Sequence, residues 1–255
     1  MHTRFISILC LLSMLLWAMP AHSEVRKDYF GSGVLKLEKT LKNGKQHGPS
    51  RWYYKNGSLQ LEENYKKGIL QGVSKVYHEN GALKAHLYYK NGLLEGKGKS
   101  YHENGQLMES VDYVKGRQHG ESKAWDKNGT LRIHARMQND LLHGLSHEYT
   151  ESGALLAIRT FQNGLIDGTV TEYYENKKTK HQLVFKKGIL DGPCSEYYED
   201  GTLKAKRSYT NNQLEGKAWL YYPDGTTQAE LDYLRGALQN TKYFDKQGRP
   251  IKAPQ

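Results

Sequence analysis

Apolar and polar side chains alternate over short segments of this chain. In residues 83–89, LKAHLYY, every second side chain is apolar, which is the period of a half-buried β-strand. Asn80-Gly81 precedes this segment and Asn91-Gly92 follows it. These dipeptides readily supply the two positive φ angles that a type I′ hairpin turn requires. The pattern therefore predicts short strands joined by tight turns.

The strand and turn pattern recurs every 24 residues along nearly the whole chain. Glycine follows each aromatic residue of one series by four positions, except where Lys177 replaces it and predicts a costlier or different turn. A further glycine series is unbroken from Gly48 to Gly216. Such self-similarity predicts an all-β, elongated antiparallel meander of about nine 24-residue β-hairpin repeats. The aromatic series is Tyr29, Tyr53, Tyr77, Tyr101, Trp125, Tyr149, Tyr173, Tyr197 and Tyr221.

The ends of the chain differ from the repeats. Residues 1–23 combine an early positive charge, an apolar run and the small residues Ala21 and Ser23 before Glu24, which predicts a cleaved signal peptide. The apolar run is shorter than the ~20 residues that a membrane-spanning helix needs. We therefore expect three segments: a signal peptide at 1–23, the repeat array at 24–248 and a C-terminal tail at 249–255. Export to the periplasm or the medium is the expected localisation.

Cysteine content and net charge limit the possible cross-links and binding partners. Removal of the signal peptide would leave Cys194 as the sole cysteine, so no disulfide can form within the mature chain. We expect its thiol to act as a small buried apolar group. The formal net charge is +10, which permits binding to an anionic partner. Acidic residues are nevertheless interleaved through the repeats and export removes the usual targets, so no nucleic acid partner is expected.

No catalytic constellation stands out in the sequence. It contains no nucleophile motif, no phosphate-binding loop and no paired cysteines for zinc. His78 and His102 recur one repeat apart, too far to share one metal ion, and we expect them to be exposed strand residues. The chain is therefore predicted to be non-enzymatic, with no metal, no cofactor and no small-molecule substrate.

Two series of surface positions are candidates for binding. The residue after the repeat aromatic is tyrosine in several repeats, and alternation along a strand predicts that it faces away from the aromatic series. The residue two before that aromatic is cationic in four successive repeats. Aromatic rows are common in protein interfaces, although they can also flank a curved sheet, and lysines can simply keep a sheet soluble. The candidate partner-binding residues are Tyr174, Tyr198, Tyr222 and Tyr54, and the candidate anionic-ligand residues are Arg51, Lys75, Lys99 and Lys123.

The repeat unit resembles a known family. Residues 77–96, YHENGALKAHLYYKNGLLEG, are similar to MORN repeats, and most of all to the variant found in bacterial YwqK-type proteins, which are commonly described as antitoxins. The similarity extends from about Tyr29 to Phe244. It implies a β-hairpin scaffold that binds proteins or phospholipids. The signal peptide is a departure from a cytoplasmic antitoxin.

These observations favour an exported, non-enzymatic scaffold that binds another protein. Its most concrete form is a periplasmic immunity or antitoxin protein that neutralises a toxin or secreted effector by covering it. The alternative is a peripheral membrane module whose basic stripe binds anionic phospholipid headgroups. A third hypothesis is a structural spacer in the cell envelope.

Overall fold

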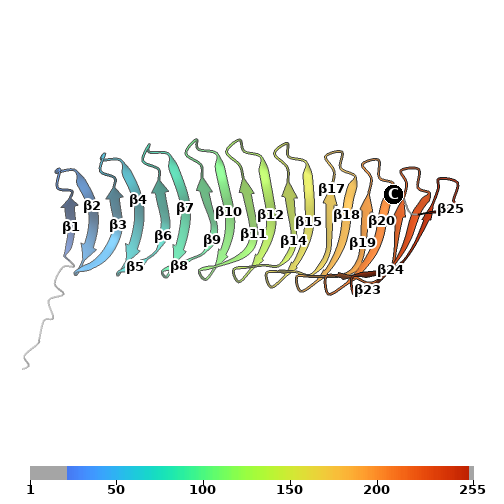
Figure 1. Cartoon of the computed structure of the whole chain (residues 1–255). Helices are drawn as coiled ribbons and strands as arrows, with labels where there is room; N and C mark the ends of the chain where they lie inside the picture. The colour runs from blue at the N-terminus through green and yellow to red at the C-terminus, as the bar shows by residue number, and fades with distance from the viewer. Residues whose placement is uncertain (1–21, 253–255) are drawn as a thin grey trace, which may run out of the picture.

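The structure is a computed structural model and describes residues 22–252. All regular elements of this range are β-strands, and each strand pairs antiparallel with its neighbours in sequence. They form one long, bowed, open sheet whose strands follow one another from the N-terminal to the C-terminal end (Figure 1). The predicted all-β meander of hairpin repeats is confirmed. Residues 22–252 contain no helix that could span a bilayer.

Each repeat contributes one unbroken strand and one longer strand, and the longer strand is often interrupted. The strands are β1 (Ser23–Tyr29), β2 (Leu35–Lys42), β3 (Lys45–Tyr53), β4 (Leu59–Lys66), β5 (Ile69–Leu70), β6 (Gly72–Tyr77), β7 (Leu83–Lys90), β8 (Leu93–Leu94), β9 (Gly96–Tyr101), β10 (Leu107–Val114), β11 (Arg117–Trp125), β12 (Leu131–Gln138) and β13 (Leu141–Leu142). They continue with β14 (Gly144–Tyr149), β15 (Leu155–Gln162), β16 (Leu165–Ile166), β17 (Gly168–Tyr173), β18 (Thr179–Lys186), β19 (Ile189–Tyr197), β20 (Leu203–Thr210), β21 (Gln213–Leu214), β22 (Gly216–Tyr221), β23 (Thr227–Leu234), β24 (Ala237–Phe244) and β25 (Pro250–Ile251).

The turns after the aromatic series are not the type I′ turns that the Asn-Gly pairs predict. Between β3 and β4, the Gly57 amide donates to the Tyr54 carbonyl, and the Tyr54 amide donates to the Ser58 carbonyl. Gly57 has φ +86°, whereas Asn56 keeps a negative φ. This geometry is a type I turn followed by a left-handed residue. The Asn56 side chain contributes by accepting a hydrogen bond from the Ser58 amide at 2.9 Å.

Type I′ turns occur at the opposite edge of the sheet. Asn91 and Gly92, between β7 and β8, both have positive φ angles, at 52° and 80°. The same conformation recurs at equivalent positions, including Lys67-Gly68 and Lys187-Gly188. The two edges of the sheet therefore carry different turns, although Asn-Gly pairs occur at both.

The unbroken glycine series marks a bulge in each longer strand. Leu70 pairs with Tyr65, but Lys75 pairs with Glu62, so this strand contains two more residues than its partner over the same stretch. Gly72 lies inside this excess with φ +88°. A bulge bends its strand and increases the local twist. Its recurrence in every repeat accounts for the bow of the sheet in Figure 1.

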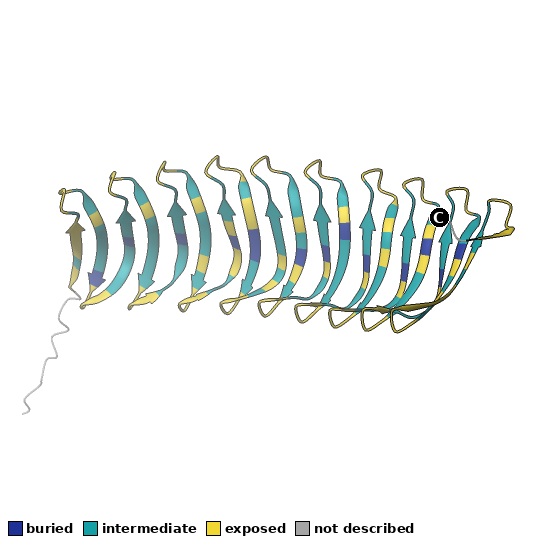
Figure 2. Ribbon diagram, in the orientation of Figure 1, coloured by how far each residue is buried: buried dark blue, intermediate teal, exposed yellow. Residues whose placement is uncertain are grey.

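Small side chains form the most buried line of the sheet. Ser50 and Ser74 are 0% and 2% exposed, and they lie in the middle of the longer strands. We call the face that carries this line the inner face and the opposite one the outer face. Figure 2 shows the buried segments recurring along the sheet. The buried members of the line are Ser50, Ser74, Gly98, Ser146, Val170, Cys194 and Ala218.

A series of large side chains packs against this line on the inner face. A Cβ atom at Gly98 would lie 2.8 Å from Cε2 of Tyr113 and 3.1 Å from Cδ2 of Leu87, so this position tolerates only glycine without rearrangement. Burial raises the pKa of Tyr89 and Tyr113. The core is thus a thin layer in which small and large residues alternate. The series is Leu41, Tyr65, Tyr89, Tyr113, Met137, Phe161, Phe185, Tyr209 and Tyr233.

The two ends of the array and one irregular repeat depart from the regular pattern. The predicted signal peptide lies outside the described residues except for its last two, and Ser23 begins β1. The sheet extends past the predicted boundary at residue 248, because Pro250 and Ile251 pair with β24. Lys177 adopts the left-handed conformation of the glycine it replaces, with φ 68°, so its repeat keeps the common turn in a costlier form.

Candidate functional site

The four candidate tyrosines lie just beyond the ends of their strands and join neighbouring repeats. Tyr54, for example, follows the last residue of β3, where strand alternation ends. Their rings are half-buried, as are those of the aromatic series beside them. Each hydroxyl donates to a backbone carbonyl of the next repeat. These bonds are Tyr54 to Tyr77 at 2.8 Å, Tyr174 to Tyr197 at 2.7 Å, Tyr198 to Tyr221 at 2.8 Å and Tyr222 to Phe244 at 2.9 Å.

The histidines of the same series occupy the equivalent position. Nε2 of His78 lies 3.0 Å from the Tyr101 carbonyl, and Nε2 of His102 lies 3.1 Å from the Trp125 carbonyl. Both rings are half-buried. The prediction that they are exposed strand residues is therefore wrong, because they replace tyrosine in the same inter-repeat hydrogen bond. This position is part of the framework in most repeats.

The C-terminal tyrosine rings are also in contact with lysines. Lys180, Lys204 and Lys246 place Nζ at 5.7, 5.8 and 5.9 Å from the ring centroids of Tyr174, Tyr198 and Tyr222. Such cation–π contacts contribute ~0.5–1 kcal/mol each at exposed sites. A partner that reached these residues would meet the rings and their lysines, since the hydroxyl groups are already engaged.

The predicted basic stripe lies on the outer face, and its members differ in their surroundings. Arg51 forms an ion pair with Glu62 at 2.8 Å, and this hydrogen-bonded carboxylate raises the pKa of the guanidinium. Lys123 forms an ion pair with Glu121 at 2.9 Å. Lys75 and Lys99 have no ion pair to a carboxylate among the described residues. Two of the four cations are therefore partly neutralised at the ends of the stripe.

The strands between the stripe residues supply further basic side chains. Lys75 pairs in register with His86, and His86 pairs in turn with Lys99. Ser110 then separates Lys99 from Lys123. Beyond Lys123 the register continues through His134 to His147, whose rings stack with centroids 6.0 Å apart. We call Lys75, His86, Lys99, Lys123, His134 and His147 the basic row.

The aromatic series runs beside the basic row on the outer face. Tyr77 and Lys75 are two residues apart on β6, so their side chains point to the same side. Farther along, the Tyr197 hydroxyl donates to Oε1 of Gln182 at 3.3 Å, and Gln182 continues the line of the basic row. The outer face thus carries two parallel lines, one basic and one aromatic.

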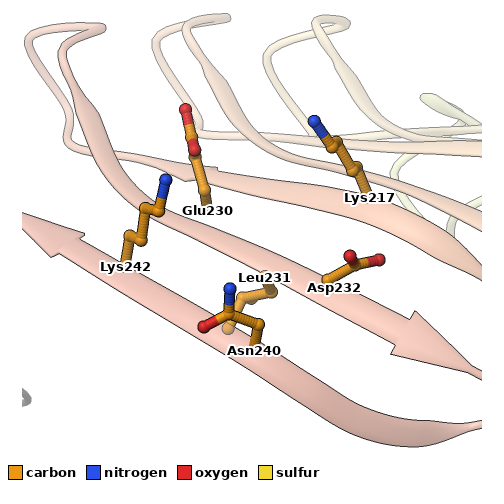
Figure 3. A pocket seen from close by; sticks show the side chains of 6 residues that line it. All are labelled: Lys217, Glu230, Leu231, Asp232, Asn240 and Lys242. Carbon is orange, nitrogen blue, oxygen red and sulfur yellow. The ribbon is translucent and has the colours of Figure 1, made fainter.

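The C-terminal end of the outer face carries both positive and negative side chains, unlike the basic row. A shallow hollow there is lined by side chains of β22, β23 and β24, and lysines and carboxylates face one another across it (Figure 3). This mixture of charges gives the hollow no net preference for anions or cations. The lining residues are Lys217, Glu230, Leu231, Asp232, Asn240 and Lys242.

The described residues contain no cluster of three or more histidine, cysteine or acidic side chains that could hold a metal ion. Cys194 is buried, at 6% exposure, and burial raises the pKa of its thiol. The prediction of a small buried residue is confirmed for Cys194. A raised pKa lowers the fraction of reactive thiolate, so this thiol is poorly suited to act as a nucleophile.

Comparison with protein families identifies the repeats. The family described as "MORN repeat variant" matches residues 46–67, 70–91, 94–115, 118–139, 166–187 and 190–211, and the family described as "MORN repeat" matches residues 208–227. The chain belongs to the MORN repeat family. MORN repeats are generally scaffolds that bind proteins or membranes, and the family is not known for enzymatic activity.

Other comparisons add little to this assignment. No curated protein matches the chain. Two crystal structures, described as TcdB2-TccC3-Cdc42 and TcdB2-TccC3-TEV, match at 14% and 12% identity over 87% and 89% of this chain, with TM-scores of 0.22 and 0.23. The MORN array spans 14% of the length of each matched chain. Likeness at this level says nothing about fold or function.

Proposed function

We propose that this MORN-repeat protein is an exported, non-enzymatic scaffold that binds another protein. The observation that supports it best is the outer face, where the backbone register aligns a basic line and an aromatic line over many strands. A surface held by main-chain pairing loses little conformational entropy when a partner docks. Aromatic side chains are enriched in protein interfaces, and basic side chains steer a partner of opposite charge. The segment at residues 1–23 supports export.

The most concrete version is a periplasmic immunity or antitoxin protein that covers a toxin or secreted effector. Tyr174, Tyr198, Tyr222 and Tyr54 contribute ring surface, with their hydroxyl groups kept for the framework. The test is co-expression and pull-down of the mature chain with the product of the adjacent gene. Binding together with protection of the cells supports the proposal. A mature, folded chain that neither binds nor protects contradicts the immunity role.

A peripheral membrane module is the second candidate, and the basic side chains on one face favour it. Arg51, Lys75, Lys99 and Lys123 would then contact anionic headgroups, and vesicle binding should weaken steeply with salt. Replacing all four with Glu should abolish that binding. Binding that is absent or insensitive to salt would exclude this candidate.

A further inference from the structure

We propose that the basic row is the docking site for an acidic segment of a partner polypeptide. This inference rests on the proposed protein-binding function and specifies the chemistry of the partner. The row crosses seven adjacent strands, from β6 to β14, in continuous register. Neighbouring strands are about 4.8 Å apart. The row therefore extends for roughly 29 Å, which is the length of about nine residues of extended peptide.

Charge on the same face favours an anionic occupant. Three carboxylates lie beside the row, and each is already paired with a cation. Glu62, in register with Lys75, pairs with Arg51 at 2.8 Å, Asp112 pairs with Lys97 at 2.6 Å, and Glu121 pairs with Lys123 at 2.9 Å. Glu121 also lies 3.6 Å from Nε2 of His134. The N-terminal half of the row, from Lys75 through His86 to Lys99, forms no ion pair with a carboxylate among the described residues. Lys99 is exposed there. An acidic segment would supply the missing counter-charges.

The surroundings of the row favour a polypeptide over a membrane. The row lies along the middle of the strands. The exposed aliphatic residues that follow the type I′ turns lie instead along one edge of the sheet. Ile69, Leu93 and Leu165 are examples, at 51%, 50% and 51% exposure. A bilayer that contacted the row would have to meet the bowed face of the sheet instead of this apolar edge. The half-buried tyrosines beside the row suit the apolar side chains of a protein segment.

The test uses the full mature chain and a fluorescent deca-glutamate peptide as probe. In the row variant, Lys75→Gln, Lys99→Gln and Lys123→Gln remove three charges. In the matched control, Lys55→Gln, Lys66→Gln and Lys90→Gln remove three charges from exposed positions outside the row. Circular dichroism and thermal unfolding verify that both variants are folded. Affinity is measured by fluorescence anisotropy at two salt concentrations.

We expect the row variant to bind the peptide about tenfold or more weakly than the unmodified chain, because three ion pairs with the peptide are lost. The control should stay within about threefold, because it changes only the net charge. An equal loss in both variants, or no loss in either, overturns the proposal. Row-dependent binding to phosphatidylglycerol vesicles without peptide binding also overturns it, in favour of a membrane.

The same variants separate this inference from the proposed function. If the adjacent gene product binds the row variant and the unmodified chain equally well, the scaffold function stands and the basic row is not its site. If neither form binds any candidate protein, but the peptide still distinguishes row from control, the acidic-ligand site stands and the immunity role fails.

Discussion

The hydrogen bond from Tyr198 to the next repeat offers the most direct test of how the array is held together. Tyr198→Phe removes one hydroxyl and keeps the ring. The lost bond to the Tyr221 carbonyl is 2.8 Å long and half-buried. A hydrogen bond of this kind contributes ~0.5–1.5 kcal/mol net, and a fully buried carbonyl left without a donor would add a larger penalty. Because water can reach this half-buried carbonyl, we expect destabilisation of about 1 kcal/mol.

Urea unfolding measures this change. With a slope of ~2 kcal/mol/M, a loss of about 1 kcal/mol lowers the midpoint by about 0.5 M. Because repeat arrays are stabilised by nearest-neighbour contacts, hydrogen exchange should also accelerate in β22 and the strands beside it more than in the N-terminal repeats. Binding of a protein partner through the ring should be unaffected by this substitution.

The adjacent residue provides a matched control. Tyr197→Phe removes a hydroxyl whose bond to Gln182 is longer, at 3.3 Å, and exposed. We expect a change within about 0.5 kcal/mol, as for most surface substitutions. If Tyr198→Phe leaves the midpoint unchanged, or if Tyr197→Phe costs as much, the inter-repeat bond does not have the structural role assigned to it.

Three further predictions concern the turns and the core. Lys177→Gly should stabilise the chain by about 0.5–1 kcal/mol in urea unfolding. Glycine relieves the left-handed strain, and this gain exceeds the extra entropy that glycine loses on folding. A loss of stability would contradict this. Gly98→Ala should cost ~1–3 kcal/mol, since its Cβ would overlap Tyr113, and an unchanged thermal midpoint would show that the ring moves aside freely. The Thr202 amide and hydroxyl hold the pKa of Asp200 below its usual range, so this carboxylate stabilises the fold above about pH 4 and ceases to do so as the pH falls through the lowered pKa. Asp200→Asn should therefore reduce the loss of thermal stability between about pH 5 and pH 2, and an identical acid profile would refute it.

The repeat fold was predictable because every structural requirement recurs at a fixed spacing. The type of turn was not, because Asn-Gly serves both edges of the sheet. At Asn56-Gly57, the Asn56 side chain accepts a hydrogen bond from the Ser58 amide, and the Asn56 backbone keeps a negative φ. At Asn91-Gly92 both residues are left-handed. The difference depends on where the strands end, and alternation does not determine that to within one residue.

The candidate site was predictable only in part for a related reason. Lys75 and Lys99 recur in one series, so the spacing identifies them as neighbours along the array. His86 belongs to the intervening strand and to a different series, and only the cross-strand register places it between them. The tyrosines after the aromatic series were expected, as strand residues, to face away from that series. Tyr54 lies one residue beyond β3, where alternation no longer determines direction.

The pairing of each strand only with its sequence neighbours also bears on how such a chain can change over evolutionary time. Duplication or loss of one 24-residue unit inserts or removes two adjacent strands and leaves every other pairing intact. Each such event would lengthen or shorten the outer face by about 10 Å. The reach of the molecule can thus be adjusted in single genetic steps to the size of what it contacts, without redesign of the core.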